Sequence, residues 1–168
     1  KVKTSIDKAL GVNAPLVIGE FGYKHKDGAV DYQTIMDYCT EKNVGYLGWS
    51  WTGNGGGVEF LDMFSDYTDN NMEENGKIII LGKNGIKETS KECSVFGGTT
   101  TPVVPVVPVD PVTPTSTGFH ISGTKLLDAN GNNFIMRGVN YSYAWQHGDC
   151  SIAQSVISAA KRQKANCI

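Results

Sequence analysis

A stretch with proline at every third position constrains most strongly what this chain can fold into, because it divides the chain in two. It runs from Thr99 to Thr117 and reads TTTPVVPVVPVDPVTPTST. The spacing matches the three-residue turn of a polyproline II helix, which predicts an extended, semi-rigid spacer of roughly 60 Å. Its P-x-x-P repeat would also suit a proline-binding domain, but no lysine or arginine orients it. We therefore predict an interdomain linker at 99–117 between two folded segments, 1–98 and 118–168.

The segment before the linker alternates helix and strand patterns. Apolar spacing predicts a helix over 2–10, and Asp31 is a candidate N-cap for a second helix. Two compact apolar runs, 16–21 and 45–51, are typical of parallel strands buried on both faces. A third helix is expected over 69–81. This order favours an α/β fold with a parallel sheet.

The segment after the linker begins differently. Residues 119–128 predict a small β-hairpin, and Asn130-Gly131 is a turn signal that leads to a strand over 134–139. An amphipathic helix is expected from Ser151, and 165–168 has the pattern of the opening of one more strand.

Composition excludes some classes of function. A net charge of -2 and a pI near 5.9 predict neither a nucleic-acid partner nor a membrane partner. No apolar run reaches the ~20 residues of a transmembrane helix. The first residues lack the apolar core of a signal peptide, so we expect any such peptide to lie upstream and both ends to be cut from a longer protein.

The cysteines leave two interpretations open. They form no C-x-x-C pair and have no histidine at ligand spacing, so a metal site is not expected, nor is a cofactor. Buried free thiols and two disulfides fit the sequence equally well. The four residues are Cys39, Cys93, Cys150 and Cys167.

A glutamate at the end of a predicted strand is the candidate catalytic group. Glu20 lies at the C-terminal end of the run 16–21, followed by Phe21, where barrel side chains point into the mouth of an active site, although such a glutamate can also form a structural ion pair. Two tryptophans follow on the next strand. We assign Trp49 to the core and Trp51 to sugar binding by ring stacking, with Asn54 beside it in a glycine-rich loop.

These motifs resemble the last two β/α units of family 5 glycoside hydrolases, and within that family they are most similar to bacterial endo-β-1,4-mannanases. The matching stretches before the linker are LVIGEFG (16–22), KHKDGAVD (24–31), LGWSWTGN (47–54) and GIKETSK (85–91). The segment after the linker resembles the start of the same barrel, and its matching stretches are GFHISG (118–123), LDANG (127–131) and FIMRGVN (134–140).

The resemblance implies a (β/α)8 TIM barrel, present only as partial segments, and a retaining reaction with two carboxylates ~5–5.5 Å apart. It makes Glu20 the nucleophile and Arg137 the arginine that orients a nucleophile, although an ordinary salt bridge is the alternative for Arg137. The acid/base glutamate of the family follows an asparagine, and that pair is absent here. His25 matches a mannanase histidine expected near the substrate groove, but a solvated loop histidine fits as well.

The segment that resembles the end of a barrel comes before the segment that resembles the start of one. We therefore predict that this chain is part of a longer protein with two tandem catalytic domains, with a circularly permuted barrel as the alternative. Arg137 would then serve the second barrel, and Glu20 the first. The threonine-flanked linker suggests a secreted, extracellular multidomain enzyme with other catalytic or binding domains. Half a barrel exposes strand edges, so residues 1–168 alone are expected to be inactive and unstable.

The expected substrate is β-mannan. Related mannanases carry a histidine-rich stretch where this chain has Asn140-Tyr-Ser-Tyr-Ala-Trp145, and this departure keeps an endo-β-1,4-glucanase (cellulase) acting on β-glucan open. His147 and Asp149 have no partner predictable from sequence. A non-catalytic carbohydrate-binding fragment is a third interpretation, but buried parallel strands argue against it, because small binding modules are usually antiparallel sandwiches.

Overall fold

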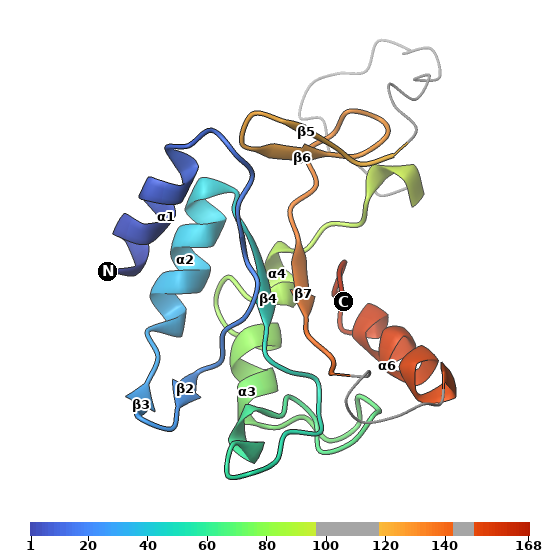
Figure 1. The fold of residues 1–168 in the computed structure, drawn as a ribbon. Helices are drawn as coiled ribbons and strands as arrows, with labels where there is room; N and C mark the ends of the chain where they lie inside the picture. Colours follow the sequence, from blue (N-terminus) through green and yellow to red (C-terminus); the bar gives the residue numbers. More distant parts are fainter. Residues whose placement is uncertain (97–117, 143–149) are drawn as a thin grey trace.

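The computed structural model describes residues 1–96, 118–142 and 150–168. A three-stranded parallel sheet lies at its centre, in the order β1 (Val17–Ile18), β4 (Gly45–Gly48) and β7 (Arg137–Val139) (Figure 1). Cys167 extends this sheet by a parallel bridge to Gly138. The predicted α/β class with parallel strands is therefore confirmed, while the predicted linker lies outside the described residues.

Two helices cover the sheet on the N-terminal side. α1 (Val2–Leu10) and α2 (Tyr32–Lys42) pack against each other, and α1 has the predicted bounds (Figure 1). The carboxylate of Asp31 accepts a hydrogen bond from the Thr34 amide at 3.3 Å, which satisfies one of the free amides at the start of α2. The predicted N-cap is thus confirmed.

The remaining elements of the first segment are short. The third predicted helix forms over a smaller range, as α3 (Glu74–Gly76) and a π-helical turn (Lys77–Leu81). The others are β2 (Lys24–His25), β3 (Gly28–Ala29), α4 (Ile86–Thr89) and two 3-10 turns (Glu59–Leu61 and Ser94–Phe96). β2 and β3 form an antiparallel hairpin.

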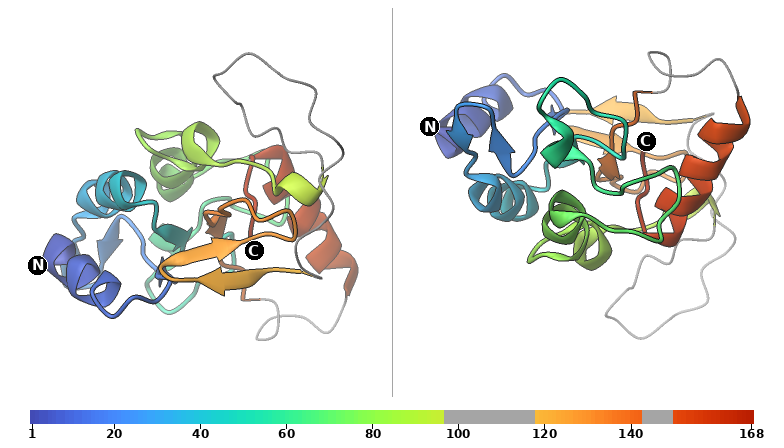
Figure 2. Two further views of the ribbon diagram at one scale, coloured as in Figure 1. Left: turned by 90° about the horizontal axis from the view of Figure 1, so that it is seen from above. Right: turned by 90° about the horizontal axis from the view of Figure 1, so that it is seen from below.

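The second segment forms most of the predicted elements, some over shorter ranges. β7 (Arg137–Val139) covers the end of the strand predicted over 134–139, and the stretch 165–168 contributes the bridge of Cys167. β5 (His120–Ser122) and β6 (Lys125–Leu127) form the hairpin, and α6 (Cys150–Arg162) is the amphipathic helix. α1 and α6 lie at opposite ends of the molecule in each view (Figures 1 and 2).

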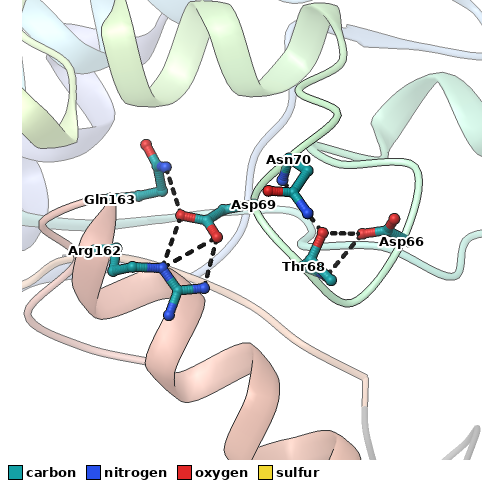
Figure 3. A network of polar contacts seen from close by, with 6 residues as sticks. All are labelled: Asp66, Thr68, Asp69, Asn70, Arg162 and Gln163. Carbon is teal, nitrogen blue, oxygen red and sulfur yellow. Dashed lines mark hydrogen bonds and ion pairs between the residues drawn. The ribbon is translucent and has the colours of Figure 1, made fainter.

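Polar contacts fasten the second segment to the first. Arg162 of α6 forms a bidentate ion pair with Asp69, with its shortest N–O distance 2.6 Å, and Gln163 donates to the same carboxylate at 2.9 Å (Figure 3). In the loop that carries Asp69, Asp66 accepts hydrogen bonds from the amide and hydroxyl of Thr68 (Figure 3). The two segments are therefore packed as one body around one sheet.

Asp128 makes a second set of polar contacts between the two segments. Its carboxylate accepts hydrogen bonds from the Ser94 amide and hydroxyl and from the amides of Asn130 and Asn132. Burial opposes ionisation of Asp128, yet these donors outweigh it and hold its pKa below the ordinary value. The turn after β6 is thereby tied to the end of the first segment.

The pairing of β7 with β4 is the one that a single closed barrel shows, because its first strand lies beside its last. In tandem barrels, β4 and β7 would each pair within their own barrel. The division into two barrels remains a prediction.

β1 differs from its prediction. Val17 is 40% exposed and Ile18 is only half-buried, because β1 pairs on one side alone and forms an edge of the described sheet. The expected burial on both faces is therefore wrong for this strand. Among the described residues, no helix is long and apolar enough to cross a membrane.

Candidate functional site

The carboxyl ends of the three parallel strands form the candidate site. Glu20 follows β1, Trp49 follows β4 and Asn140 follows β7. Parallel strands end along one edge of a sheet, so the structure brings these three positions together. The side chain of Glu20 is exposed, as a nucleophilic carboxylate must be to reach a substrate.

Hydrogen bonds to backbone carbonyl groups fix this edge of the sheet. The Trp49 amide donates to Phe21 O at 2.8 Å, and Asn140 Nδ2 donates to Gly19 O at 2.9 Å. The residues on either side of Glu20 are thus held from the ends of β4 and β7. This fixes the backbone of Glu20 and leaves its side chain in solvent.

The roles expected for the two tryptophans are reversed. Trp51 is fully buried and stacks on Phe64, with ring centroids 4.3 Å apart. It belongs to the core, so the predicted sugar-binding role is wrong. Trp49 is partly exposed at the strand edge and is the indole able to meet a sugar ring.

Asn54 supports Trp49 and does not face solvent as a free ligand. Its Oδ1 accepts the indole N–H of Trp49 at 2.8 Å, and its Nδ2 donates to Ser50 Oγ at 2.9 Å and to Asp62 Oδ1 at 2.6 Å. The amide group that sequence reasoning assigned to the substrate is therefore engaged within the protein. Asn54 lies at the site, but its side chain holds the indole of Trp49 by a hydrogen bond.

The structure contradicts the predicted role of Arg137. Its guanidinium is buried and donates to four uncharged acceptors, Thr89 Oγ1, Val44 O, Met136 O and Thr40 Oγ1, at 2.7–3.4 Å. It also lies 4.4 Å from the ring centre of Tyr46. Thr40 lies on α2 and Thr89 at the end of α4, while Val44 and Met136 directly precede β4 and β7. Arg137 therefore points toward the helices and the amino ends of the strands, and not to the carboxyl ends where a nucleophile would lie.

Among the described residues, the alternative for Arg137, an ordinary salt bridge, is not formed either, since its four acceptors carry no charge. Burial lowers the pKa of this guanidinium from its ordinary value. The role predicted for Arg137 came from its resemblance to the family arginine, but the side chain of a strand residue takes one face or the other by alternation.

His25 lies on the β2–β3 hairpin and lines an open cavity of about 590 Å³. Its Nδ1 is 3.3 Å from Asp27 Oδ2, and both side chains are largely exposed. Three aromatic residues share the cavity with it, namely Tyr23, Tyr32 and Phe60. His25 is thus a solvated hairpin histidine that also borders a hollow beside the residues after Glu20.

Sequence reasoning missed three polar residues of the site. Asn75 is fully buried and donates to Trp49 O at 2.8 Å and to Leu61 O at 2.7 Å, while Asp62 holds Asn54. Asn140 could have been found, because it directly follows a predicted strand. Asn75 and Asp62 carry no such signal, since they reach the site from a helix and a loop.

The cysteines are all free: Cys39 and Cys93 are buried, Cys150 is exposed and Cys167 is intermediate. Burial raises the pKa of Cys39 to about 11, so this thiol stays protonated. Of the two interpretations left open by the sequence, the structure takes that of free thiols. In the part of the chain that the structure describes, no group of three metal-ligating side chains is found.

The stretch of sequence that carries this site matches a known protein family. Residues 1–55, which include β1, Glu20 and β4, match the cellulase family, glycosyl hydrolase family 5. The predicted resemblance to this family of glycoside hydrolases is therefore confirmed.

Two relatives of this chain are mannanases. The chain is 45% identical over 98 residues to a mannan endo-1,4-beta-mannosidase of Streptomyces lividans, covering 58% of this chain and 26% of the relative. A mannan endo-1,4-beta-mannosidase of Salipaludibacillus agaradhaerens is 41% identical over 95 residues, with coverages of 56% and 31%.

Solved mannanase structures are also similar to part of this chain. The beta-mannanase of Thermomonospora fusca superposes with a TM-score of 0.54 at 44% identity, covering 57% of this chain and 32% of that chain. The mannotriose complex of that enzyme gives a TM-score of 0.52 at 42% identity, with coverages of 57% and 31%. The chain thus spans about a quarter to a third of these relatives, and 57% of it superposes on part of a mannanase structure.

Proposed function

We propose that the full-length protein hydrolyses internal β-1,4 bonds of mannan with retention of configuration, and that Glu20 is the nucleophile. The observation that carries this proposal is the exposed carboxylate of Glu20 at the carboxyl end of a parallel strand, inside the stretch that matches family 5. The mannanase relatives support mannan as the substrate. The segments 1–98 and 118–168 are proposed to be parts of (β/α)8 barrels.

The proposed reaction has two steps. The Glu20 carboxylate attacks the anomeric carbon, the glycosidic C–O bond breaks, and a second carboxylic acid gives its proton to the departing sugar oxygen. Water, deprotonated by that second group, then attacks the glycosyl–Glu20 ester and releases the sugar with its original configuration. The acid/base group lies outside this chain, so neither segment is a complete catalyst.

Trp49 replaces Trp51 as the proposed sugar platform. Its indole is partly exposed and is fixed by a hydrogen bond to Asn54, so its face can be presented in one orientation. An aromatic face packs on the C–H bonds of a pyranose ring. His25 is proposed to border the same substrate groove through the cavity it lines.

A β-1,4-glucanase activity is the second candidate. Two observations favour it: the stretch from Asn140 lacks the histidines of related mannanases, and one relative, 43% identical over 70 residues, is a beta-mannanase/endoglucanase A of Caldicellulosiruptor saccharolyticus. A purely carbohydrate-binding role fits less well, because the central sheet is parallel.

The proposed setting is extracellular. The proline- and threonine-rich stretch 99–117 suits a linker of a secreted enzyme with further catalytic or binding domains. We propose a polysaccharide as the partner of this protein, with no nucleic acid, membrane or cofactor involved.

The test compares Glu20→Gln with Glu41→Gln in the full-length protein, on mannan and on carboxymethylcellulose. Glu41 is an exposed glutamate of α2 that pairs with Lys42, so its substitution should leave kcat/KM within about twofold. Glu20→Gln should lower kcat by ~10³-fold or more. Because tandem barrels would each carry a nucleophile, residual activity is measured with any second barrel inactivated.

A chemical signature completes the test. With Glu20→Gly, azide should restore cleavage of an activated β-mannoside and yield the α-mannosyl azide, because azide takes the face that the carboxylate occupied. Unchanged turnover by Glu20→Gln would refute the nucleophile role. Turnover on the cellulose derivative alone would favour the glucanase.

A further inference from the structure

We propose that Asn54 and Asp62 form a polar clamp that sets the orientation of Trp49, and that sugar affinity depends on Asp62 although it need not touch the sugar. The inference rests on the proposed function, since it takes Trp49 as the sugar platform. Asn54 and Asp62 are therefore positioning residues.

The chemistry of the three groups explains why an asparagine stands between the other two. An indole N–H can only donate a hydrogen bond and an ionised carboxylate can only accept. Asn54 accepts from Trp49 Nε1 at 2.8 Å and donates to Asp62 Oδ1 at 2.6 Å. Because Asp62 must receive Nδ2, the amide oxygen is turned to the indole, and the carboxylate thereby fixes which way the Asn54 amide faces.

The clamp is held to the backbone at several points. The Asn54 amide N–H donates to the same Asp62 oxygen at 3.0 Å, so Asp62 fixes both backbone and side chain of Asn54. On the other side of Trp49, the buried Asn75 donates to Trp49 O and to Leu61 O, the carbonyl preceding Asp62. Indole and backbone of Trp49 are therefore both anchored, which leaves the ring little freedom.

The carboxylate of Asp62 accepts hydrogen bonds from Asn54, and it forms no ion pair within the described part of the chain. Burial raises the pKa of Asp62, the hydrogen bonds from Asn54 lower it, and the charges of Glu59 and Glu73 raise it further. Asn54 is thus its main stabilising partner. A second carboxylate placed at position 54 would face Asp62 at hydrogen-bond distance, where two like charges cannot both persist.

The test uses Asn54→Asp, Asp62→Asn and the double variant in the full-length protein. Asn54→Asp keeps the acceptor for the indole but sets two carboxylates against each other, so KM for mannohexaose should rise about tenfold at pH 7, with kcat within about threefold. At lower pH a proton shared by the pair should reduce this defect. The double variant restores one donor and one acceptor in reversed order, and KM should return to within about threefold of the original without the pH dependence.

Glu73→Gln is the matched control, because it removes a neighbouring charge but no hydrogen bond of the clamp; its KM should not change. The ¹⁵N–¹H signal of the Trp49 indole, assigned by its loss in Trp49→Phe, should shift in Asn54→Asp and return in the double variant. Unfolding temperatures check that each variant is folded.

An unchanged KM in folded Asn54→Asp, or a double variant no better than Asn54→Asp, would overturn the clamp. Failure of the proposed function is distinguishable, because then the unaltered protein would not hydrolyse mannan, while the indole signal would still report whether Asn54 and Asp62 hold Trp49.

Discussion

Replacing Arg137 by methionine or lysine tests whether it stabilises the fold, as the structure indicates, or orients a nucleophile, as the family resemblance implies. As a buried cation, Arg137 donates four hydrogen bonds to uncharged groups, with the shortest to Val44 O at 2.7 Å. A hydrogen bond from a charged group contributes about 1.5–3 kcal/mol, and the cost of removing the guanidinium from water offsets part of the sum. Arg137→Met should therefore lower the free energy of unfolding by about 3 kcal/mol.

Arg137→Lys should lose roughly half as much, because one ammonium cannot reach acceptors on α2, α4 and β4 at once. The assay is urea unfolding of the full-length protein, followed by tryptophan fluorescence, with kcat on mannan measured well below the transition. We expect kcat within about threefold of the original, because the guanidinium of Arg137 is engaged by Thr89, Val44, Met136 and Thr40 and not by Glu20. A hundredfold loss of kcat with unchanged stability would refute this reasoning and return Arg137 to the nucleophile.

Four further predictions follow from the packing. Trp51→Phe should cost less than about 2 kcal/mol, because the buried indole nitrogen has no hydrogen-bond partner among the described residues, whereas Trp51→Ala should cost about 3–5 kcal/mol; thermal unfolding measures both. Gly138→Ala should destabilise by at least ~2 kcal/mol in the same assay, since a Cβ there would overlap the backbone oxygen of Cys167. Asp69→Asn should cost about 0.5–1 kcal/mol, because Arg162 is largely exposed; the Arg162 hydrogen bond holds the pKa of Asp69 below its ordinary value, so the contribution is complete above about pH 5 and fades as urea titrations are taken toward pH 3. A thiol reagent should label exposed Cys150 in the native protein and leave Cys39 unmodified until unfolding, and equal rates at both would contradict the structure.

Local signals predicted most of the fold. The bounds of α1, the cap at Asp31 and the hairpin β5–β6 follow from spacing and turn chemistry within a few residues. Glu20 was reached the same way, from its position at a strand end. What failed depended on contacts distant in the sequence: Arg137 meets Val44 93 residues away, and Asn75 reaches Trp49 from 26 residues away.

The reversal of the two tryptophans shows why local pattern stops short at this site. On a continuous strand over 45–51, Trp49 and Trp51 would lie two positions apart and share one face, so alternation could not separate them. β4 instead ends at Gly48, and the backbone after it is shaped by the amide of Trp49 on Phe21 O and that of Trp51 on Asn140 O. These partners lie at the ends of β1 and β7, the two strands that flank β4. Contacts with both strands therefore determine which indole is exposed. Glu20 and its sugar platform are therefore positioned by a strand on the far side of the proline-rich stretch.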